Sequence, residues 1–276
     1  MPTMTRAGAR DRFVTVNGVR LRYRDWGGRG RPFLALHGSA AHAHWWDPVA
    51  PYLARRLRVL ALDWRGHGRS AWPRPPAYGS EEFAADLLGV IRALRLERVV
   101  VAGHSMGGQA ALVFAAWHPQ ALERLVVLDA RPMVNLQRLL ALQARGERPR
   151  LEFESRAAAL RRFRLSPPET AASPEVLRAI GARGVRRLPS GRWTYRFDPA
   201  CQRTRVPVDA WPLLPGIQVP TLIVRGELST ILPRDVAERI AKAIPSARLE
   251  ELAGAYHHVT LDAPAALAEC LLAWLG

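Results

Sequence analysis

Hydrophobic residues fall into two different rhythms along this 276-residue chain. Near the N-terminus, apolar and polar residues alternate on both sides of Asn17-Gly18, in the stretch RFVTVNGVRLRYRDWG. That dipeptide favours a type I′ turn, so the stretch predicts a β-hairpin. Further along, short continuous apolar runs are separated by segments with helical spacing. Strands that are apolar on both faces are typical of parallel sheets covered by helices.

Five apolar runs of strand length predict the parallel strands of such a sheet. They are PFLALHG, LRVLALDW, RVVVAGHS, RLVVLDA and PTLIVRG. Helical spacing occurs in SEEFAADLLGVIRALRL, LPRDVAERIAKAI and APAALAECLLAWL. Ser80 is a candidate N-cap of the first of these helices. A hairpin followed by repeated strand–helix units predicts an α/β fold with a mostly parallel, doubly wound sheet.

The alternation of strands and helices stops in the middle of the chain, between residues 131 and 211. This segment is rich in arginine and proline and has mostly helical spacing. It follows the sixth predicted strand, so we interpret it as a helical lid over the carboxyl ends of the strands, where open α/β sheets bind ligands. The predicted domains are a core of residues 1–130 and 212–276, and a lid of residues 131–211.

Positive charge is concentrated in this predicted lid. The formal net charge of the chain is +16, and Lys242 is the only lysine. Residues 131–206 contain 17 arginines against six aspartates and glutamates. No nucleic-acid-binding motif accompanies the charge, so we predict no specific binding of nucleic acid. A second interpretation is that the lid arginines favour substrates that carry a carboxylate or a phosphate.

The remaining composition points to a cytoplasmic protein. Cys201 and Cys270 are too few for a disulfide framework and lack metal-ligand spacing. The N-terminal stretch MPTMTRAGARDRF has no apolar signal core. The sequence has no run of about 18 apolar residues, so it predicts no membrane span. We therefore expect a soluble protein without a metal, an organic cofactor or a membrane partner.

The strongest chemical motif is Gly103-His104-Ser105-Met106-Gly107, a G-x-S-x-G sequence between a predicted strand and a predicted helix. In that context the sharp turn exposes the serine at the strand end. The following helix N-terminus supplies N–H groups that suit a developing anion. Ser105 is therefore the candidate nucleophile. We assign no base role to His104, because a residue at this position usually packs beside the strand.

A second glycine turn follows the strand in FLALHGSAAHAHWW. Glycine lets the backbone turn sharply there. The N–H groups of Ser39 and Met106 would then form a two-donor oxyanion hole. We expect His37 to fix this turn by a structural hydrogen bond.

With these motifs, the chain resembles the α/β-hydrolase fold family over nearly its full length. The hairpin, HGSA, DWRGHGRS, GHSMGG, the lid, PTLIVRGE and AYHHVTLDAP occur in the order of that family. The resemblance implies that the base comes last in the chain, after the final strand. Register favours His257 as that base, and His258 is the alternative. Asp262 then reads as the N-cap of the last helix.

The acid of the triad is missing from the position where this family commonly has it. Three residues after Gly226, the chain has Ser229 instead of aspartate. The resemblance offers Asp129, after the sixth strand, because some members carry the acid there. Glu227 is the second candidate, and a site without an acid is the third.

These residues predict a serine hydrolase that acts on a small carboxylic ester. Ser105 is the nucleophile, His257 the base and Asp129 the acid. Carbon–carbon hydrolases and thioesterases use the same triad and remain alternatives, as does a ligand-binding protein on a disarmed hydrolase fold. Candidate pocket residues are Trp45, Trp46, Leu136, Leu139, Leu140, Phe163, Trp193 and Trp211.

Overall fold

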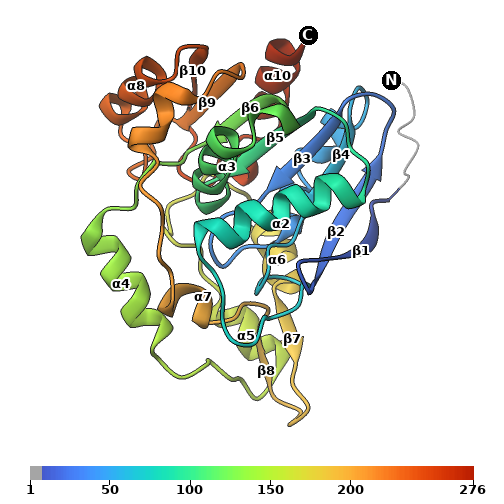
Figure 1. Cartoon of the computed structure of the whole chain (residues 1–276). Coiled ribbons are helices and arrows are strands. Elements are labelled where there is room, and N and C mark those ends of the chain that lie inside the picture. The colour runs from blue at the N-terminus through green and yellow to red at the C-terminus, as the bar shows by residue number, and fades with distance from the viewer. Residues whose placement is uncertain (1–7) are drawn as a thin grey trace.

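The computed structural model describes residues 8–276 of the chain (Figure 1). Residues 1–7 lie outside the described residues, and they include part of the stretch MPTMTRAGARDRF, in which the sequence shows no apolar signal core. Among the helices of residues 8–276, none has the length and apolar character needed to cross a membrane.

Eight strands form one large sheet in the order β1-β2-β4-β3-β5-β6-β9-β10. The strands are β1 (Arg10–Val16), β2 (Val19–Gly27), β3 (Pro32–Leu36), β4 (Arg58–Leu62), β5 (Val99–His104), β6 (Leu122–Leu128), β9 (Thr221–Gly226) and β10 (Ala247–Leu252). The pairs β1–β2 and β2–β4 are antiparallel, and every other neighbouring pair is parallel. The prediction of a mostly parallel α/β sheet is confirmed.

The first two strands form the predicted hairpin. Asn17 and Gly18 connect them with φ angles of 49° and 71°. A type I′ turn needs positive φ at both central residues, and Asn-Gly tolerates this best. The hairpin forms one edge of the sheet, and β10 forms the other.

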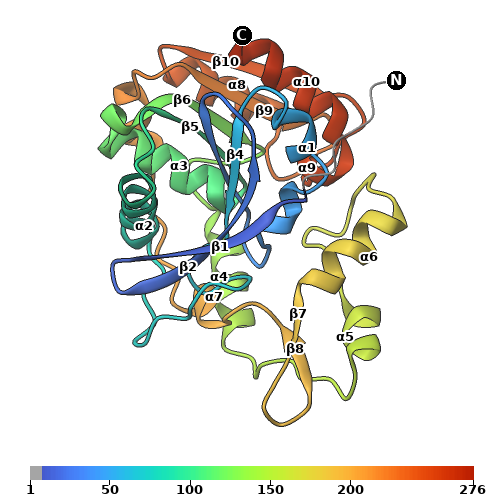
Figure 2. The same cartoon turned by 90° about the vertical axis from the view of Figure 1, so that its right-hand side faces the viewer.

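Helices cover both faces of the sheet (Figure 2). One face carries α2 (Ser80–Ala93), α3 (Met106–Trp117), α8 (Arg234–Ala243) and the 3₁₀ helix η3 (Trp211–Gly216). The other carries α1 (Ala50–Leu53), α10 (Pro264–Leu275), the short helix α9 (Val259–Asp262) and the 3₁₀ helix η1 (Ala43–Trp46). A further 3₁₀ turn, η2 (Pro119–Ala121), precedes β6.

The central strands are apolar on both faces because both faces are covered. In β5, Val99 and Val101 belong to the core on the α2–α3 side, whereas Val100 and Ala102 belong to the core on the α1–α10 side. All four side chains are fully buried. This alternation explains the continuous apolar runs in the sequence.

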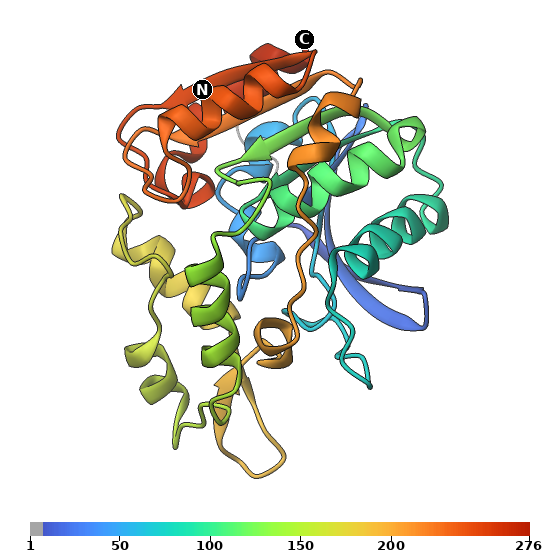
Figure 3. The ribbon, with the colours of Figure 1, turned by 60° about the vertical axis from the view of Figure 1, so that its left-hand side comes forward.

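Between β6 and β9 the chain leaves the sheet and forms smaller elements, which lie together on one side of it (Figures 1 and 3). They are α4 (Leu136–Gly146), α5 (Arg156–Arg162), α6 (Pro174–Arg183), β7 (Val185–Arg187), β8 (Trp193–Tyr195) and α7 (Ala200–Arg203). β7 and β8 pair antiparallel, so this segment contains a β-ribbon that the helical pattern did not predict.

Candidate active site

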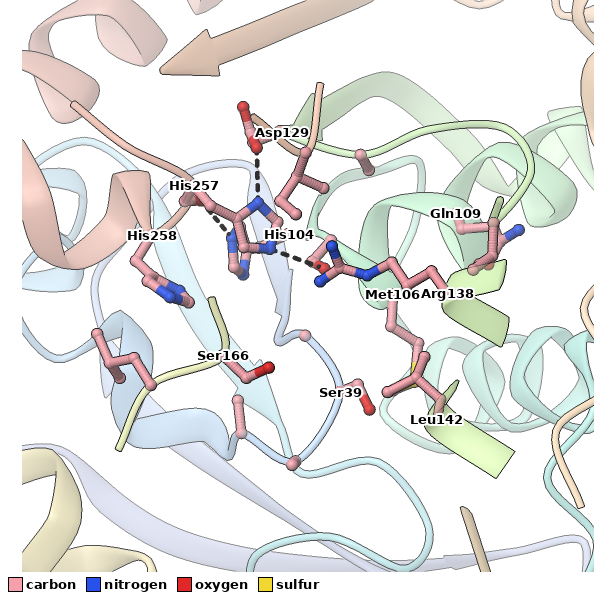
Figure 4. Close-up of a pocket in the computed structure, with 18 of the residues that line it drawn as sticks. Ser39, His104, Met106, Gln109, Asp129, Arg138, Leu142, Ser166, His257 and His258 are labelled. Atoms are coloured by element: carbon pink, nitrogen blue, oxygen red, sulfur yellow. Dashed lines mark hydrogen bonds and ion pairs between the residues drawn. The ribbon is translucent and has the colours of Figure 1, made fainter. Parts of the chain in front are cut away.

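Three polar side chains meet at the carboxyl edge of the sheet, and Figure 4 labels two of them, Asp129 and His257. Ser105 follows β5, Asp129 follows β6, and His257 lies in the loop after β10. The Nε2 atom of His257 lies 3.1 Å from Ser105 Oγ, and its Nδ1 atom lies 2.6 Å from Asp129 Oδ2. The structure thus brings into one hydrogen-bonded chain the serine, histidine and carboxylate that the sequence analysis selected.

The turn that carries Ser105 is strained and tightly packed. Ser105 has φ 54° and ψ −117°, a conformation that residues other than glycine rarely adopt. A Cβ on Gly103 would lie 2.2 Å from the carbonyl oxygen of Gly107, so only glycine fits there. The Ser105 N–H donates to the Leu128 carbonyl at 3.0 Å, which ties the turn to β6. Neighbouring backbone therefore holds the hydroxyl at the strand end.

Asp129 is fully buried and has three hydrogen-bond donors around its carboxylate. Besides His257 Nδ1, these are the Ser229 hydroxyl at 2.6 Å and the Gly226 N–H at 3.1 Å. Burial raises the pKa of Asp129 to about 6, and the bonds from Ser229 and Gly226 oppose that rise. Ser229, at the position where the resemblance leads one to expect an acid, thus supports the carboxylate supplied by the neighbouring strand.

The second candidate acid lies away from the histidine. The side chain of Glu227 is exposed, and its carboxylate accepts the N–H of Gly254 at 2.7 Å. The hydrogen-bond partner of this carboxylate is therefore the main chain of exposed Gly254, and not the buried imidazole of His257.

The two other histidines near His257 point in different directions. The Nε2–H of His258 donates to the Pro167 carbonyl at 2.8 Å, in the segment between β6 and β9. The Nε2–H of His104 donates to the main-chain carbonyl of His257, also at 2.8 Å. Burial lowers the pKa values of all three imidazoles, those of His104 and His257 well below the usual value. Each ring is therefore neutral near pH 7, as a general base must be.

Asp262 holds the loop that carries His257, so its expected role as the N-cap of the last helix is wrong. It is the final residue of α9, and its Oδ2 accepts the N–H of Tyr256 at 3.0 Å. Its Oδ1 accepts the N–H of Ala171 at 3.0 Å and the hydroxyl of Thr170. The carboxylate therefore ties the histidine loop to the chain between α5 and α6.

The three imidazoles form the one cluster in residues 8–276 with the geometry of a candidate metal site. His104, His257 and His258 each offer one ligand atom within 4.8 Å of the others. The buried Nδ1 atoms of His104 and His258 have no hydrogen-bond partner. Because the Nε2 atoms of these two rings donate to carbonyls, the Nδ1 atoms carry lone pairs. Because His257 Nδ1 is hydrogen-bonded to Asp129, the His257 nitrogen left for a transition metal is Nε2, which is hydrogen-bonded to Ser105.

Two backbone N–H groups lie beside Ser105 without an acceptor. Ser39 and Met106 line the same cavity as Ser105, and within residues 8–276 neither N–H donates to a protein acceptor. A Cβ on Gly38 would lie 3.1 Å from Ser105 Cβ, so the loop after β3 passes directly beside the serine. Two free donors at this place are what an oxyanion requires.

His37 holds that loop, as expected. Its Nε2 accepts the N–H of Trp64 at 3.1 Å, and its carbonyl accepts the indole N–H of the same tryptophan. Burial lowers the pKa of His37 to about 3, so the ring stays neutral and keeps its acceptor.

The site opens into a cavity of about 430 Å³. Of the predicted pocket residues, Trp45 and Phe163 line it. The other six do not: Trp46, Leu136, Leu139, Leu140, Trp193 and Trp211.

Each of these six side chains has another environment. Trp46 is fully buried against Phe33, with ring centroids 6.0 Å apart. Leu136 and Leu140 are 66% and 55% exposed, because α4 turns them to solvent, and Leu139 also lies off the cavity face. Trp193 lies in β8, and Trp211 packs against the core below α8.

Arginines take the place of the expected leucines. The cavity face of α4 carries Arg138, Leu142 and Arg145, spaced four and three residues apart. Arg205, after α7, is buried and also lines the cavity. None of these three arginines was predicted individually as a site residue, although the lid arginines as a group were expected to favour substrates with a carboxylate or a phosphate. The signal that could have found them is this i, i+7 spacing on one helix face.

The chain was compared with protein-family models, with known sequences and with solved structures, and the matches agree on one family. A family model described as the alpha/beta hydrolase fold matches residues 31–264. The esterase Rv0045c of Mycobacterium tuberculosis is 32% identical over 88% of this chain and 82% of its own length. A structure of that esterase, titled for its transition metal inhibition, has a TM-score of 0.79 at 27% identity, covering 97% of this chain and 92% of that chain.

Two other relatives have different names. The 2-(acetamidomethylene)succinate hydrolase of Mesorhizobium japonicum is 27% identical over 92% of this chain and 90% of its own length. A crystal structure titled for the E isomer of that substrate has a TM-score of 0.86 at 24% identity, with 97% and 99% of the two chains covered, and shows the shared fold. The 2-hydroxy-6-oxo-6-(2'-aminophenyl)hexa-2,4-dienoic acid hydrolase of Metapseudomonas resinovorans is 25% identical over 96% of this chain and 91% of its own length.

Proposed function

This chain belongs to the alpha/beta hydrolase fold family, and from that membership we propose that it is a serine hydrolase that cleaves small carboxylic esters. One observation carries the proposal: the hydrogen-bonded chain from Ser105 Oγ through His257 to buried Asp129. A hydroxyl bonded to a neutral imidazole, whose other nitrogen is bonded to a carboxylate, is the arrangement of nucleophilic serine catalysis. The esterase name of a relative from the same family supports it.

Acylation follows from this geometry. His257 Nε2 takes the proton from Ser105 Oγ while that oxygen attacks the ester carbonyl carbon. The carbonyl oxygen becomes an oxyanion and accepts the N–H groups of Ser39 and Met106. His257 then gives its proton to the alcohol oxygen, the carbon–oxygen bond breaks, and the acyl group stays on Ser105.

Deacylation repeats these steps with water. His257 Nε2 takes a proton from the water that attacks the acyl carbon, and returns it to Ser105 Oγ as the acid leaves. Asp129 keeps the Nδ1 proton in place, so that Nε2 faces Ser105 with its lone pair in both half-reactions.

We also propose that residues 131–211 act as a lid over this site, on a core of residues 1–130 and 212–276. Phe163 and Arg138 of this segment line the cavity together with Ser105 from the sheet. The proposal requires one partner, a small-molecule ester, and neither a specific nucleic acid nor a membrane. Cytoplasmic location is part of the same proposal.

We expect 4-nitrophenyl esters to be hydrolysed, with kcat/KM falling once the acyl chain exceeds the 430 Å³ cavity. A series from acetate to dodecanoate, followed by nitrophenolate release, measures this. Ser105→Ala is the control for release that does not depend on the site. A protein that binds such esters without turnover would be a ligand-binding protein, and the proposal would be wrong.

Carbon–carbon bond hydrolysis is the second candidate, because it uses the same triad. The name of the dienoic acid hydrolase relative favours it. The test is a 2-hydroxy-6-oxo-2,4-dienoate, whose loss is followed by its visible absorbance. Turnover of this substrate with no ester hydrolysis would replace the first proposal with the second.

We expect Zn²⁺ to inhibit the hydrolase. The ion would bind the free Nδ1 atoms of His104 and His258 and compete with Ser105 for His257 Nε2. A related esterase has a structure titled for transition metal inhibition. The measurement is ester turnover against free Zn²⁺, with recovery after addition of EDTA.

His258→Gln should raise the Zn²⁺ concentration for half-inhibition by at least about tenfold, because it removes one ligand. His118→Gln is the matched control, since that ring lies at the end of α3 outside the cavity. Equal inhibition of the His258 variant and the native protein would show that the ion acts elsewhere.

A further inference from the structure

The cavity beside Ser105 has a strong excess of positive charge. Five arginines line it, and Asp129 is the only acidic residue in the lining. The arginines are Arg131, Arg138, Arg145, Arg164 and Arg205. Within residues 8–276, none of the five forms an ion pair with an acidic side chain. Asp129 is already engaged by His257, so the charge of the cavity is uncompensated.

Arg205 is the most informative of these residues because it is buried. Arg205 is only 7% exposed. In the described chain its guanidinium group makes one hydrogen bond, from Nη2 to Gln109 Oε1 at 2.8 Å. Gln109 is itself oriented by a bond from its amide to the Pro132 carbonyl at 3.1 Å. Burial, and to a smaller extent the charge of Arg138, lower the pKa of Arg205 to about 10. A buried cation without a counter-ion is costly, and an anionic ligand would offset that cost.

Three other arginines, Arg131, Arg138 and Arg145, line the same cavity as Arg205 and the catalytic residues. The pKa of Arg138 is lowered by partial burial and then by the charges of Arg145 and Arg131. The charge of Arg138 also contributes to the lowered pKa of His257. In Figure 4 the Arg138 side chain extends toward the His257 ring. The positive region therefore reaches the place where an ester carbonyl would lie against Ser105.

We propose that Arg131, Arg138, Arg145 and Arg205 form a subsite for a carboxylate or phosphate of the substrate, so that this hydrolase prefers anionic esters. Guanidinium groups match the planar oxygens of a carboxylate and bind phosphate with several hydrogen bonds. A neutral ester of the same size would leave Arg205 without a counter-ion. The preference for a kind of ester rests on the proposed hydrolase function, whereas the anion subsite itself does not.

The test compares two 4-nitrophenyl esters that differ in charge and by one methyl group. One is the 4-nitrophenyl monoester of adipic acid, and the other is the same compound with its free acid capped as a methyl ester. We expect kcat/KM for the acidic ester to exceed that for the capped ester by at least about tenfold, because a charge-assisted hydrogen bond is lost on capping. A third ester with a terminal phosphate in place of the carboxylate identifies which anion binds better. Equal kcat/KM for the acidic and capped esters would overturn the proposal.

Two variants test whether the arginines of the subsite cause the preference for the acidic ester. Arg205→Met and Arg138→Gln should each lower the ratio of kcat/KM for acidic over capped ester toward one. Arg205→Met leaves Gln109 Oε1 without its donor, so the more exposed Arg138 provides a test that does not depend on the buried site. Arg203→Gln is the matched control, because that arginine lies in α7 on the exposed surface and outside the cavity. A ratio that neither cluster variant changes would overturn the proposal.

Direct binding separates this inference from the hydrolase function. Adipate and inorganic phosphate are titrated into Ser105→Ala protein by calorimetry, with and without the Arg138→Gln change. Binding that Arg138→Gln weakens supports the anion subsite even if the native protein hydrolyses no ester. Ester turnover with no binding of either anion would leave the hydrolase function standing and overturn the subsite.

Discussion

Ser105→Ala is expected to lower kcat for ester hydrolysis by about 10⁶-fold, because the variant has no atom that can form the acyl-enzyme. The remaining rate comes from the oxyanion donors and from substrate binding. The same variant should lose covalent labelling by a fluorophosphonate, which reacts with a serine hydroxyl activated by a neighbouring base. Nitrophenolate release and gel fluorescence measure the two effects on one preparation.

Ser190→Ala is the control for this experiment. Ser190 lies in the exposed turn between β7 and β8, away from the cavity, so its loss should change neither labelling nor turnover. Labelling that persists in Ser105→Ala, or native protein that is never labelled, would contradict the nucleophile assignment. Loss of labelling with retained affinity for adipate would show that the fold is intact.

The parallel strands that were predicted from the sequence are those that are buried on both faces and therefore consist mostly of continuous apolar residues. β3, β4, β5, β6 and β9 are apolar runs because helices cover both faces of the sheet. The edge strand β10 was not among the predicted runs. Its residues alternate between half-buried and exposed from Ala247 to Glu250, Glu251 is also exposed, and the strand has a neighbour on one side only. An edge strand of this kind gives a weak periodic signal.

Local helix signals were less reliable than strand signals. Ser80 was predicted as an N-cap but is the first residue of α2, and Gly79 takes the cap position. The Gly79 N–H donates to the Glu82 carboxylate at 2.8 Å, while the Ser80 hydroxyl accepts the N–H of Val208. The Ser80 hydroxyl is thus used in a tertiary hydrogen bond to Val208 and not in a helix cap. The spacing of residues in the sequence gives no information on such a contact.

The site was predictable where chemistry is tied to strand ends. Ser105, Asp129 and His257 all follow strands, and the carboxyl ends of parallel strands share one edge of the sheet. The pocket walls were not predictable in this way. The expectation that apolar side chains line a substrate cavity selected Leu136 and Leu140, yet the orientation of α4 turns them to solvent. The orientation of a helix depends on how it packs against its neighbours. The pattern of apolar residues in one helix does not show which of its faces lines the cavity.

Asp129→Asn is expected to lower kcat by about 10⁴-fold, with the fold preserved because asparagine has the same shape. An amide in this place no longer holds the proton of His257 on Nδ1, so the imidazole is free to present the wrong tautomer to Ser105. The neutral amide also fails to stabilise the imidazolium that forms during attack. The measurements are kcat and KM for one ester and the thermal unfolding temperature. An activity within tenfold of the native protein would show that Asp129 is not the acid.

Ser229 provides the sharpest comparison with this variant, because its hydroxyl touches the same carboxylate. Ser229→Ala should lower kcat by about tenfold or less at pH 8, because the Ser229 hydroxyl is bonded to Asp129 and not to His257. Loss of this donor removes an interaction that favours the charged form and raises the pKa of Asp129 beyond about 6, so the acid limb of kcat/KM should move to higher pH. Ser229→Asp in the Asp129→Asn background should restore part of the lost rate, since Ser229 Oγ lies 2.6 Å from the carboxylate oxygen that binds His257. An unchanged acid limb in Ser229→Ala, or a greater loss there than in Asp129→Asn, would mean that the imidazole is held by a different group.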